Sequence, residues 1–174
     1  MKKTIIGALA LVLVVFGACA EQKKGTKKAK ATATASGSNT TSIKSISIHR
    51  TMCFGKCPDY FLTLSSDGKA TYMGRKFAPY QGTYEKHFDA AKVQALFKEF
   101  ERYKVDTCRA EYEYMPDIPG LIYEINYTNG REQTIKNANT PFAPKYLIGL
   151  SEQMDALAPI DGTWKKTASW EEKK

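Results

Sequence analysis

YFLTLSSDGKATYMG, residues 60–74, is the stretch from which the fold of this chain can be built. The run from Tyr60 to Leu64 is rich in residues that favour strands, and a second such run follows from Lys69 to Lys76. Between them lies Asp67-Gly68, a dipeptide typical of tight turns. We therefore predict a β-hairpin of two antiparallel strands here.

Further strands are predicted on both sides of this hairpin. Upstream, SISIHRT alternates Ile46 and Ile48 with polar residues, which indicates a half-buried strand over about 43–51. Downstream, QGTYEKHF indicates another strand over 81–88. Strands joined by short turns must run antiparallel, so these segments favour an antiparallel sheet.

LIYEINYTNGREQTI, residues 121–135, predicts a second hairpin and also its register. A three-residue loop from Thr128 to Gly130 pairs Tyr123 with Ile135, and thereby brings Ile135 onto the apolar face of the strand. A two-residue loop would put Ile135 on the opposite face. We therefore favour a type I turn with a glycine bulge.

Two helices complete the predicted domain. Asp89 is a suitable N-cap for a helix over 90–105, and a second helix is expected to start near Pro144. Each helix carries one apolar stripe, formed by Val93, Leu96, Phe97 and Phe100 in the first and by Tyr146, Leu147, Leu150, Met154 and Leu157 in the second. We expect an α+β fold: one antiparallel sheet of about six strands, with both helices packed on one face, in a single domain over 44–165 followed by a polar tail over 166–174.

The first residues predict export and lipidation. Lys2 and Lys3 precede an apolar run of about a dozen residues, too short for a spanning helix, which needs roughly 20. Phe16-Gly17-Ala18-Cys19 resembles the bacterial lipobox, in which the cysteine carries the lipid; an ordinary signal peptide cut nearby is the alternative. We expect a signal peptide over 1–18 and an acylated Cys19 that anchors the chain to a bilayer.

Residues 19–43 are expected to form a disordered tether, because they contain mostly Lys, Ala, Thr, Ser and Gly. The whole chain has a formal net charge of +8, of which Lys2 and Lys3 account for +2 and residues 20–44 for +5. Only +1 remains for residues 45–174. Since the folded part has no excess of basic residues, nucleic acid is excluded as a partner.

Several segments resemble one known family. They are HRTMCFGKCPDYFLTLSSDGKATYMG, with its motif Cys-Phe-Gly-x-Cys-Pro-x-Tyr, then PDIPG before 121–127, and the late APKYLIGLSEQMDAL. Together they resemble domain-of-unknown-function family 6438, over about residues 44–165. The resemblance implies a lipoprotein of the kind found in Bacteroidota and implies no activity.

The two cysteines of CFGKCP, residues 53–58, suggest a structural disulfide. On a straight strand Cys53 and Cys57 would be roughly 13 Å apart, beyond the reach of a disulfide, but a tight loop around Gly55 brings them together. We predict a Cys53–Cys57 disulfide that sets the shape of this loop. Two alternatives stay open: thiol redox chemistry, and a Cu(I) site made by Cys53, Cys57 and His49. The role of Cys108 is left open.

No catalytic constellation is evident in the sequence. Glu111, Glu113 and Asp117 cluster on a predicted loop but match no calcium-binding spacing. With only two histidines and no base beside a nucleophile, we expect no enzyme, no catalytic residues and no cofactor. The expectation is a lipid-anchored protein of the cell envelope, at the outer membrane in its periplasmic or surface-facing leaflet, which binds a protein partner or supports envelope structure.

Overall fold

The computed structural model describes residues 42–171. The expected signal peptide over 1–18, Cys19 and all but the end of the expected tether over 19–43 lie outside the described residues. Within residues 42–171, no helix has the length and apolar character needed to cross a membrane.

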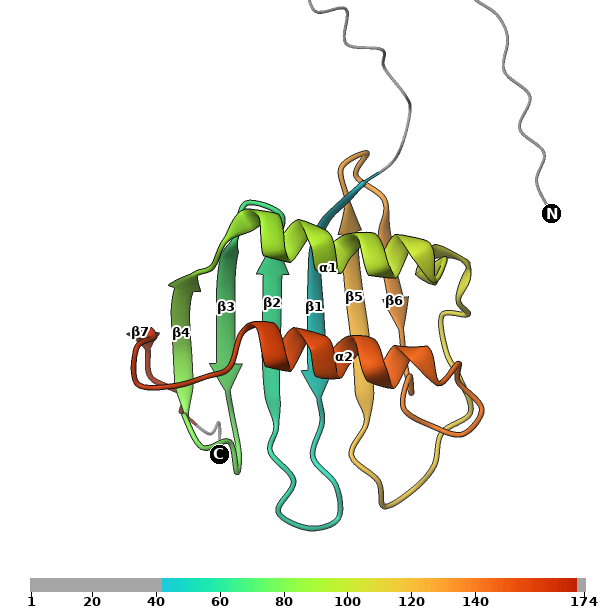
Figure 1. Ribbon diagram of the computed structural model, residues 1–174. Coiled ribbons are helices and arrows are strands. Elements are labelled where there is room, and N and C mark those ends of the chain that lie inside the picture. Colours follow the sequence, from blue (N-terminus) through green and yellow to red (C-terminus); the bar gives the residue numbers. More distant parts are fainter. Residues whose placement is uncertain (1–41, 172–174) are drawn as a thin grey trace, which may run out of the picture. The chain divides into compact units, whose positions relative to one another are not determined.

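One antiparallel sheet organises the described residues. It has seven strands in the order β6-β5-β1-β2-β3-β4-β7, so that the first strand lies inside the sheet, between the second and the fifth (Figure 1). The strands are β1 (Ile43–Arg50), β2 (Tyr60–Ser65), β3 (Lys69–Gly74), β4 (Gly82–His87), β5 (Leu121–Tyr127), β6 (Glu132–Ile135) and β7 (Lys165–Ala168). The predicted α+β class with an antiparallel sheet is confirmed.

The two predicted hairpins form as the turn residues require. In the β2–β3 turn, Gly68 has a φ of +91°, and a Cβ there would lie 2.3 Å from the carbonyl oxygen of Phe88, so no other residue fits. In the β5–β6 hairpin, Tyr123 pairs with Ile135 and Ile125 with Gln133. This is the register of the three-residue loop, and Ile135 is fully buried as predicted.

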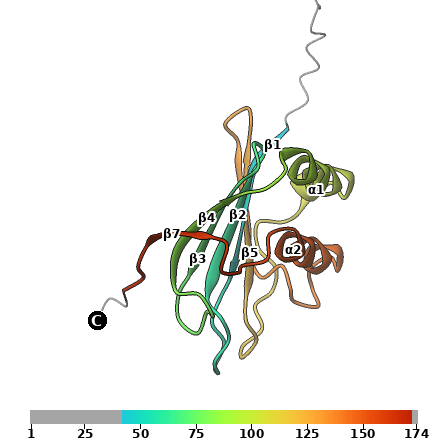
Figure 2. The ribbon, with the colours of Figure 1, turned by 60° about the vertical axis from the view of Figure 1, so that its left-hand side comes forward.

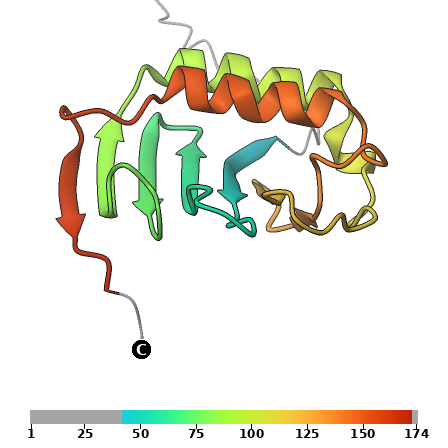
Figure 3. The same ribbon diagram turned by 90° about the horizontal axis from the view of Figure 1, so that it is seen from below.

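Two helices, α1 (Ala90–Arg102) and α2 (Tyr146–Leu157), cover one face of the sheet, as Figures 2 and 3 show. Asp89 caps α1 by accepting a hydrogen bond from the backbone N–H of Ala91. After α1 the chain makes a short 3-10 turn, η1 (Val105–Thr107), in place of the last predicted helical residues. The core lies between the layers and includes Ile46, Ile48, Leu62, Leu64, Tyr72, Val93, Phe97, Phe100, Leu121, Tyr123, Ile125, Leu147, Leu150 and Met154.

The seventh strand was missed, because it lies at the start of the segment predicted as a polar tail. β7 pairs with β4 at the sheet edge, although all four of its residues are exposed and show no alternating pattern. Trp164, just before β7, is buried against Tyr72 and Phe88 and fixes the chain there. The sheet therefore continues past residue 165 to Ala168, and at its other end Ile43 is buried and paired with Tyr127.

Candidate functional site

The most distinctive feature of the molecule is the loop Thr51–Asp59 between β1 and β2. Cys53 and Cys57 lie at disulfide distance, with their Cα atoms 5.5 Å apart, as the spacing around Gly55 predicted. The backbone N–H of Gly55 also donates to Cys53 Sγ at 3.3 Å. These contacts turn the loop back on itself and leave Phe54 at its tip 94% exposed. We call residues 51–59 the cysteine loop.

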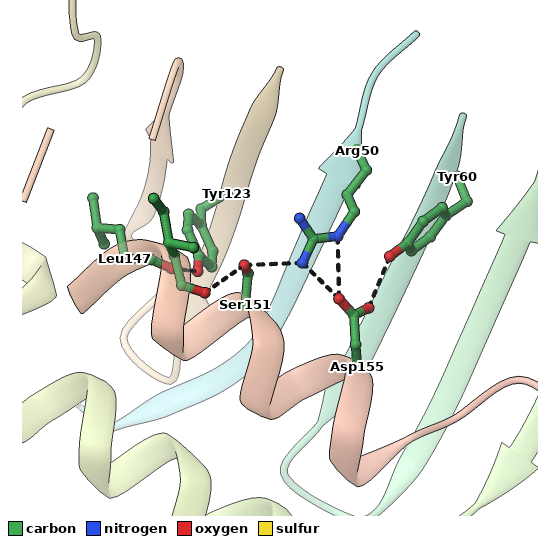
Figure 4. Close-up of polar contacts among 7 residues, drawn as sticks. Arg50, Tyr60, Tyr123, Leu147, Ser151 and Asp155 are labelled. Carbon is green, nitrogen blue, oxygen red and sulfur yellow. Dashed lines mark hydrogen bonds and ion pairs between the residues drawn. The ribbon is translucent and has the colours of Figure 1, made fainter. Parts of the chain in front are cut away.

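On the helix-covered side, the base of the cysteine loop is fixed by a polar network (Figure 4). Arg50, the last residue of β1, donates from Nε and Nη2 to Asp155 Oδ2 of α2, at 3.1 and 2.6 Å. Its Nη2 also donates to Ser151 Oγ at 3.0 Å. Tyr60, the first residue of β2, donates to the other oxygen of Asp155 at 2.9 Å. Both ends of the loop are thus held by one carboxylate of α2.

Burial and charge shift the pKa values in this network. Burial raises the pKa of the Tyr60 phenol well above its usual range, and the negative charge of Asp155 adds to the effect. Burial alone would lower the pKa of Arg50, but charge interaction with Tyr60 and bonding to Asp155 raise it above its ordinary value. Arg50 therefore remains charged, and Tyr60 stays a hydrogen-bond donor, at any physiological pH.

Thr51 ties the cysteine loop to the segment before β5. Its N–H donates to the carbonyl of Gly120 at 3.0 Å, and its Oγ1 accepts from the N–H of Gly120 at 2.8 Å. A Cβ on Gly120 would lie 2.8 Å from Thr51 Oγ1, so the close approach depends on this glycine. The quoted segments HRTMCFGKCPDY, PDIPG and APKYLIGLSEQMDAL therefore meet at the base of one loop.

On the uncovered face of the sheet, a second cluster supports the loop. Asp59 is 3% exposed, and its Oδ1 lies 2.9 Å from His49 Nε2. The other oxygen, Oδ2, lies 3.5 Å from Arg75 Nε. The His49 ring stacks on Phe61, with the ring centroids 3.8 Å apart. A buried carboxylate thus connects β1, β2 and the residue that follows β3.

A cleft of about 610 Å³ opens beside this cluster. Ligand pockets commonly have volumes of roughly 300–1,000 Å³, so this cleft is large enough for a small ligand. Loop residue Met52 and the tail residue Trp170 form part of its wall. The complete lining consists of Met52, Asp59, Phe61, Met73, Arg75, Lys76, Trp170 and Glu171. The cleft combines apolar walls with the Arg75 guanidinium.

The structure does not assemble the alternative copper site. His49 Nε2 is directed to Asp59, and the part of the chain from 42 to 171 contains no group of three His, Cys, Asp or Glu side chains placed to hold a metal ion. Cys108 is half-buried, and its Sγ lies 3.3 Å from the hydroxyl of Tyr146. Glu111, Glu113 and Asp117 are all exposed.

Arg50, Asp59, Arg75 and Asp155 were not singled out from the sequence. Arg50 and Asp155 are separated by 105 residues, so no local pattern connects them. A signal was available for Asp59, since a charged residue directly before a strand and within a cysteine motif is a candidate for a structural contact.

Comparison with known proteins identifies the family. The model of DUF6438, a domain of unknown function, matches residues 44–158. The chain belongs to this family. No curated protein and no solved structure matches the chain. Membership of DUF6438 carries no activity with it, so the function has to be argued from the site.

Proposed function

We propose that this chain is a lipid-anchored protein of the cell envelope, at the outer membrane, whose domain binds a protein partner through the cysteine loop without catalysing a reaction. The anchor rests on the lipobox-like segment that ends in Cys19. The binding role rests on a single observation: Phe54 is 94% exposed at the tip of a loop that is held at its base from both sides.

A fixed and exposed aromatic side chain suits recognition. Aromatic residues supply many of the dominant contacts in protein interfaces, because each buries a large apolar area. Ordering a flexible loop on binding costs free energy, and a loop already fixed in its bound shape avoids that cost. The Cys53–Cys57 pair, the Asp155 network and the Asp59 cluster all reduce the freedom of the cysteine loop.

The anchor is tested by labelling cells with palmitate. We expect label on the wild-type protein and none on a Cys19→Ala variant. A wild-type protein that is expressed and exported but carries no label contradicts the proposed anchor, and leaves a soluble envelope protein with the same loop.

The binding role is tested by crosslinking in intact envelopes with a photoreactive group placed at Lys56, beside Phe54 in the loop. We expect a discrete crosslinked product that is lost in Phe54→Ala. The matched control is Phe142→Ala, which removes another exposed phenylalanine, 55% exposed in the segment before α2. Equal crosslinking in the two variants would show that Phe54 is no recognition residue.

The thiol and copper alternatives predict different behaviour of Cys53 and Cys57. Mass spectrometry of the purified protein, with and without reductant and Cu(I), distinguishes them. A stable intramolecular disulfide that binds no copper supports the structural role of the pair. A readily reduced pair, or stoichiometric copper that is lost in Cys53→Ser, supports the alternative.

A further inference from the structure

Arg75 and Arg50 lie at the same end of the sheet, but they differ in the number of hydrogen bonds that their guanidinium groups donate. Its Nε faces Asp59 Oδ2 at 3.5 Å, and its Cζ lies 6.0 Å from the centroid of the Phe61 ring. These two contacts orient the guanidinium plane. Within residues 42–171, neither Nη group of Arg75 donates a hydrogen bond. By contrast, Arg50 uses Nε and Nη2 for three hydrogen bonds.

The surroundings of Arg75 are apolar on several sides. Met52, Phe61, Met73 and Trp170 line the same cleft, whose volume of 610 Å³ is within the range of small-ligand sites. Met52 and Met73 are 45% and 40% exposed, so part of this apolar surface faces solvent. A ligand that enters the cleft would cover apolar side chains and meet the guanidinium at the same time.

The charges in the cleft favour an anionic group at Arg75. The carboxylate of Asp59 is already engaged on both oxygens, by His49 and by Arg75, and it is buried. Lys76 and Glu171 also line the cleft and balance each other in formal charge. The exposed donors of Arg75 therefore set the preference, and a planar guanidinium matches a carboxylate through two parallel hydrogen bonds.

We propose that this cleft binds a carboxylate carried on an apolar or aromatic body. The carboxylate pairs with the Nη groups of Arg75, and the body contacts Met52, Phe61, Met73 and Trp170. Asp59 acts as a positioning residue, because it holds Arg75 and His49 and does not touch the ligand. This site is separate from the Phe54 contact of the proposed function, and either can exist without the other.

The test is calorimetric titration of the mature chain, residues 19–174, in a Cys19→Ser form that carries no lipid. The probe is 4-phenylbutyrate, and its neutral amide, 4-phenylbutyramide, is the matched ligand. We expect saturable binding of the acid with one site per chain. Because hydrogen bonds to charged groups are the strong ones, the amide should bind at least about tenfold more weakly.

Variants locate the site. Arg75→Met should weaken binding of the acid at least about tenfold, and Arg75→Lys should fall between it and the wild type, since lysine keeps the charge but not the planar pair of donors. Arg131→Met is the control, because Arg131 lies at the β5–β6 turn, at the opposite end of the sheet (Figure 1). Phe54→Ala should leave this binding unchanged, which separates the outcome from that of the proposed function.

Tryptophan fluorescence gives an independent readout. Trp170 lines the cleft, whereas Trp164 is buried in the core, so the acid should change the emission of the wild type but not that of Trp170→Phe. A peptide ending in a free phenylalanine carboxylate distinguishes the source: tighter binding than that of 4-phenylbutyrate indicates a peptide terminus, and weaker binding a free acid. No saturable binding, equal affinity for acid and amide, or full affinity in a folded Arg75→Met variant would overturn the proposal.

Discussion

The two faces of the sheet hold the same loop in different ways. On the helix-covered face, α2 lies over Arg50 and Tyr60, and Asp155 and Ser151 accept hydrogen bonds from them (Figure 4). On the other face, Figure 3 shows no helix among residues 42–171, and the contact of Arg75 to Asp59 is longer, at 3.5 Å. A guanidinium whose donors are satisfied internally stabilises the fold, whereas one with open donors beside apolar walls is available to a ligand. The comparison predicts that disturbing the first face costs stability and disturbing the second costs binding.

Alkaline pH should have the largest effect, and it should act through the helix-covered face. Burial raises the pKa of Tyr72 from 10.0 to about 12, and burial also raises the pKa values of Tyr60 and Tyr123. The folded state therefore keeps these protons while the unfolded chain loses them, so the stabilisation is complete below pH 10 and is lost as the pH rises further. At pH 11 each of these tyrosines should lower the free energy of unfolding by roughly 1 kcal/mol, and by less where the phenol is only partly buried.

Urea unfolding at pH 8 and pH 11 measures this loss. Tyr60→Phe should reduce the difference in unfolding free energy between the two pH values, because one titrating group is removed. A wild-type protein equally stable at both pH values would mean that these phenols ionise freely in the folded state.

Asp155→Ala should cost about 2–3 kcal/mol in the free energy of unfolding at pH 7. The variant leaves Arg50 half-buried without its carboxylate and removes the acceptor of Tyr60. The figure is below that for a fully buried pair, because the side chains of Arg50 and Asp155 are 27% and 34% exposed. Glu152→Ala, at an exposed position of the same helix, should change stability by less than about 0.5 kcal/mol. A similar loss of unfolding free energy in Asp155→Ala and Glu152→Ala would show that the polar network does not stabilise the fold.

Replacing both cysteines of the loop, Cys53→Ser and Cys57→Ser, should cost about 2 kcal/mol or less at pH 7, since the closed loop is short. The same substitution should broaden the amide resonances of residues 54–56 in NMR spectra, because the loop tip gains freedom. Unchanged spectra would show that the two polar networks alone fix the loop. Thermal unfolding of the oxidised and reduced wild type provides the control.

Arg75→Met should have the smallest effect on folding, a change of less than about 0.5 kcal/mol. The Arg75 side chain is 39% exposed and its ion pair is long, so little stability depends on it. Urea unfolding beside Asp155→Ala gives the direct comparison of the two faces. If Arg75→Met lowered the free energy of unfolding as much as Asp155→Ala does, Arg75 would be a structural residue. The proposed difference between the two faces of the sheet would then be wrong.

Local pattern was enough for much of the fold. The burial of Val93, Leu96, Phe97 and Phe100 follows from helical spacing, and the β5–β6 register follows from which loop puts Ile135 on the apolar face. The Cys53–Cys57 contact follows from a short loop around glycine. β7 was missed because an exposed edge strand buries no side chain, and therefore leaves no alternation in the sequence.

The sequence by itself determined the elements, the antiparallel pairing of neighbours and the position of the cysteine loop, because strand and helix periodicity and turn chemistry act over a few residues. Only the tertiary structure decided which polar groups meet. Asp155 reaches Arg50 across 105 residues, and His49 turns to Asp59 rather than to the cysteines. A charged side chain must either pair with another polar group or remain in contact with solvent. Which of these is possible depends on how the sheet and the helices pack, and not on the residues next to it in the sequence.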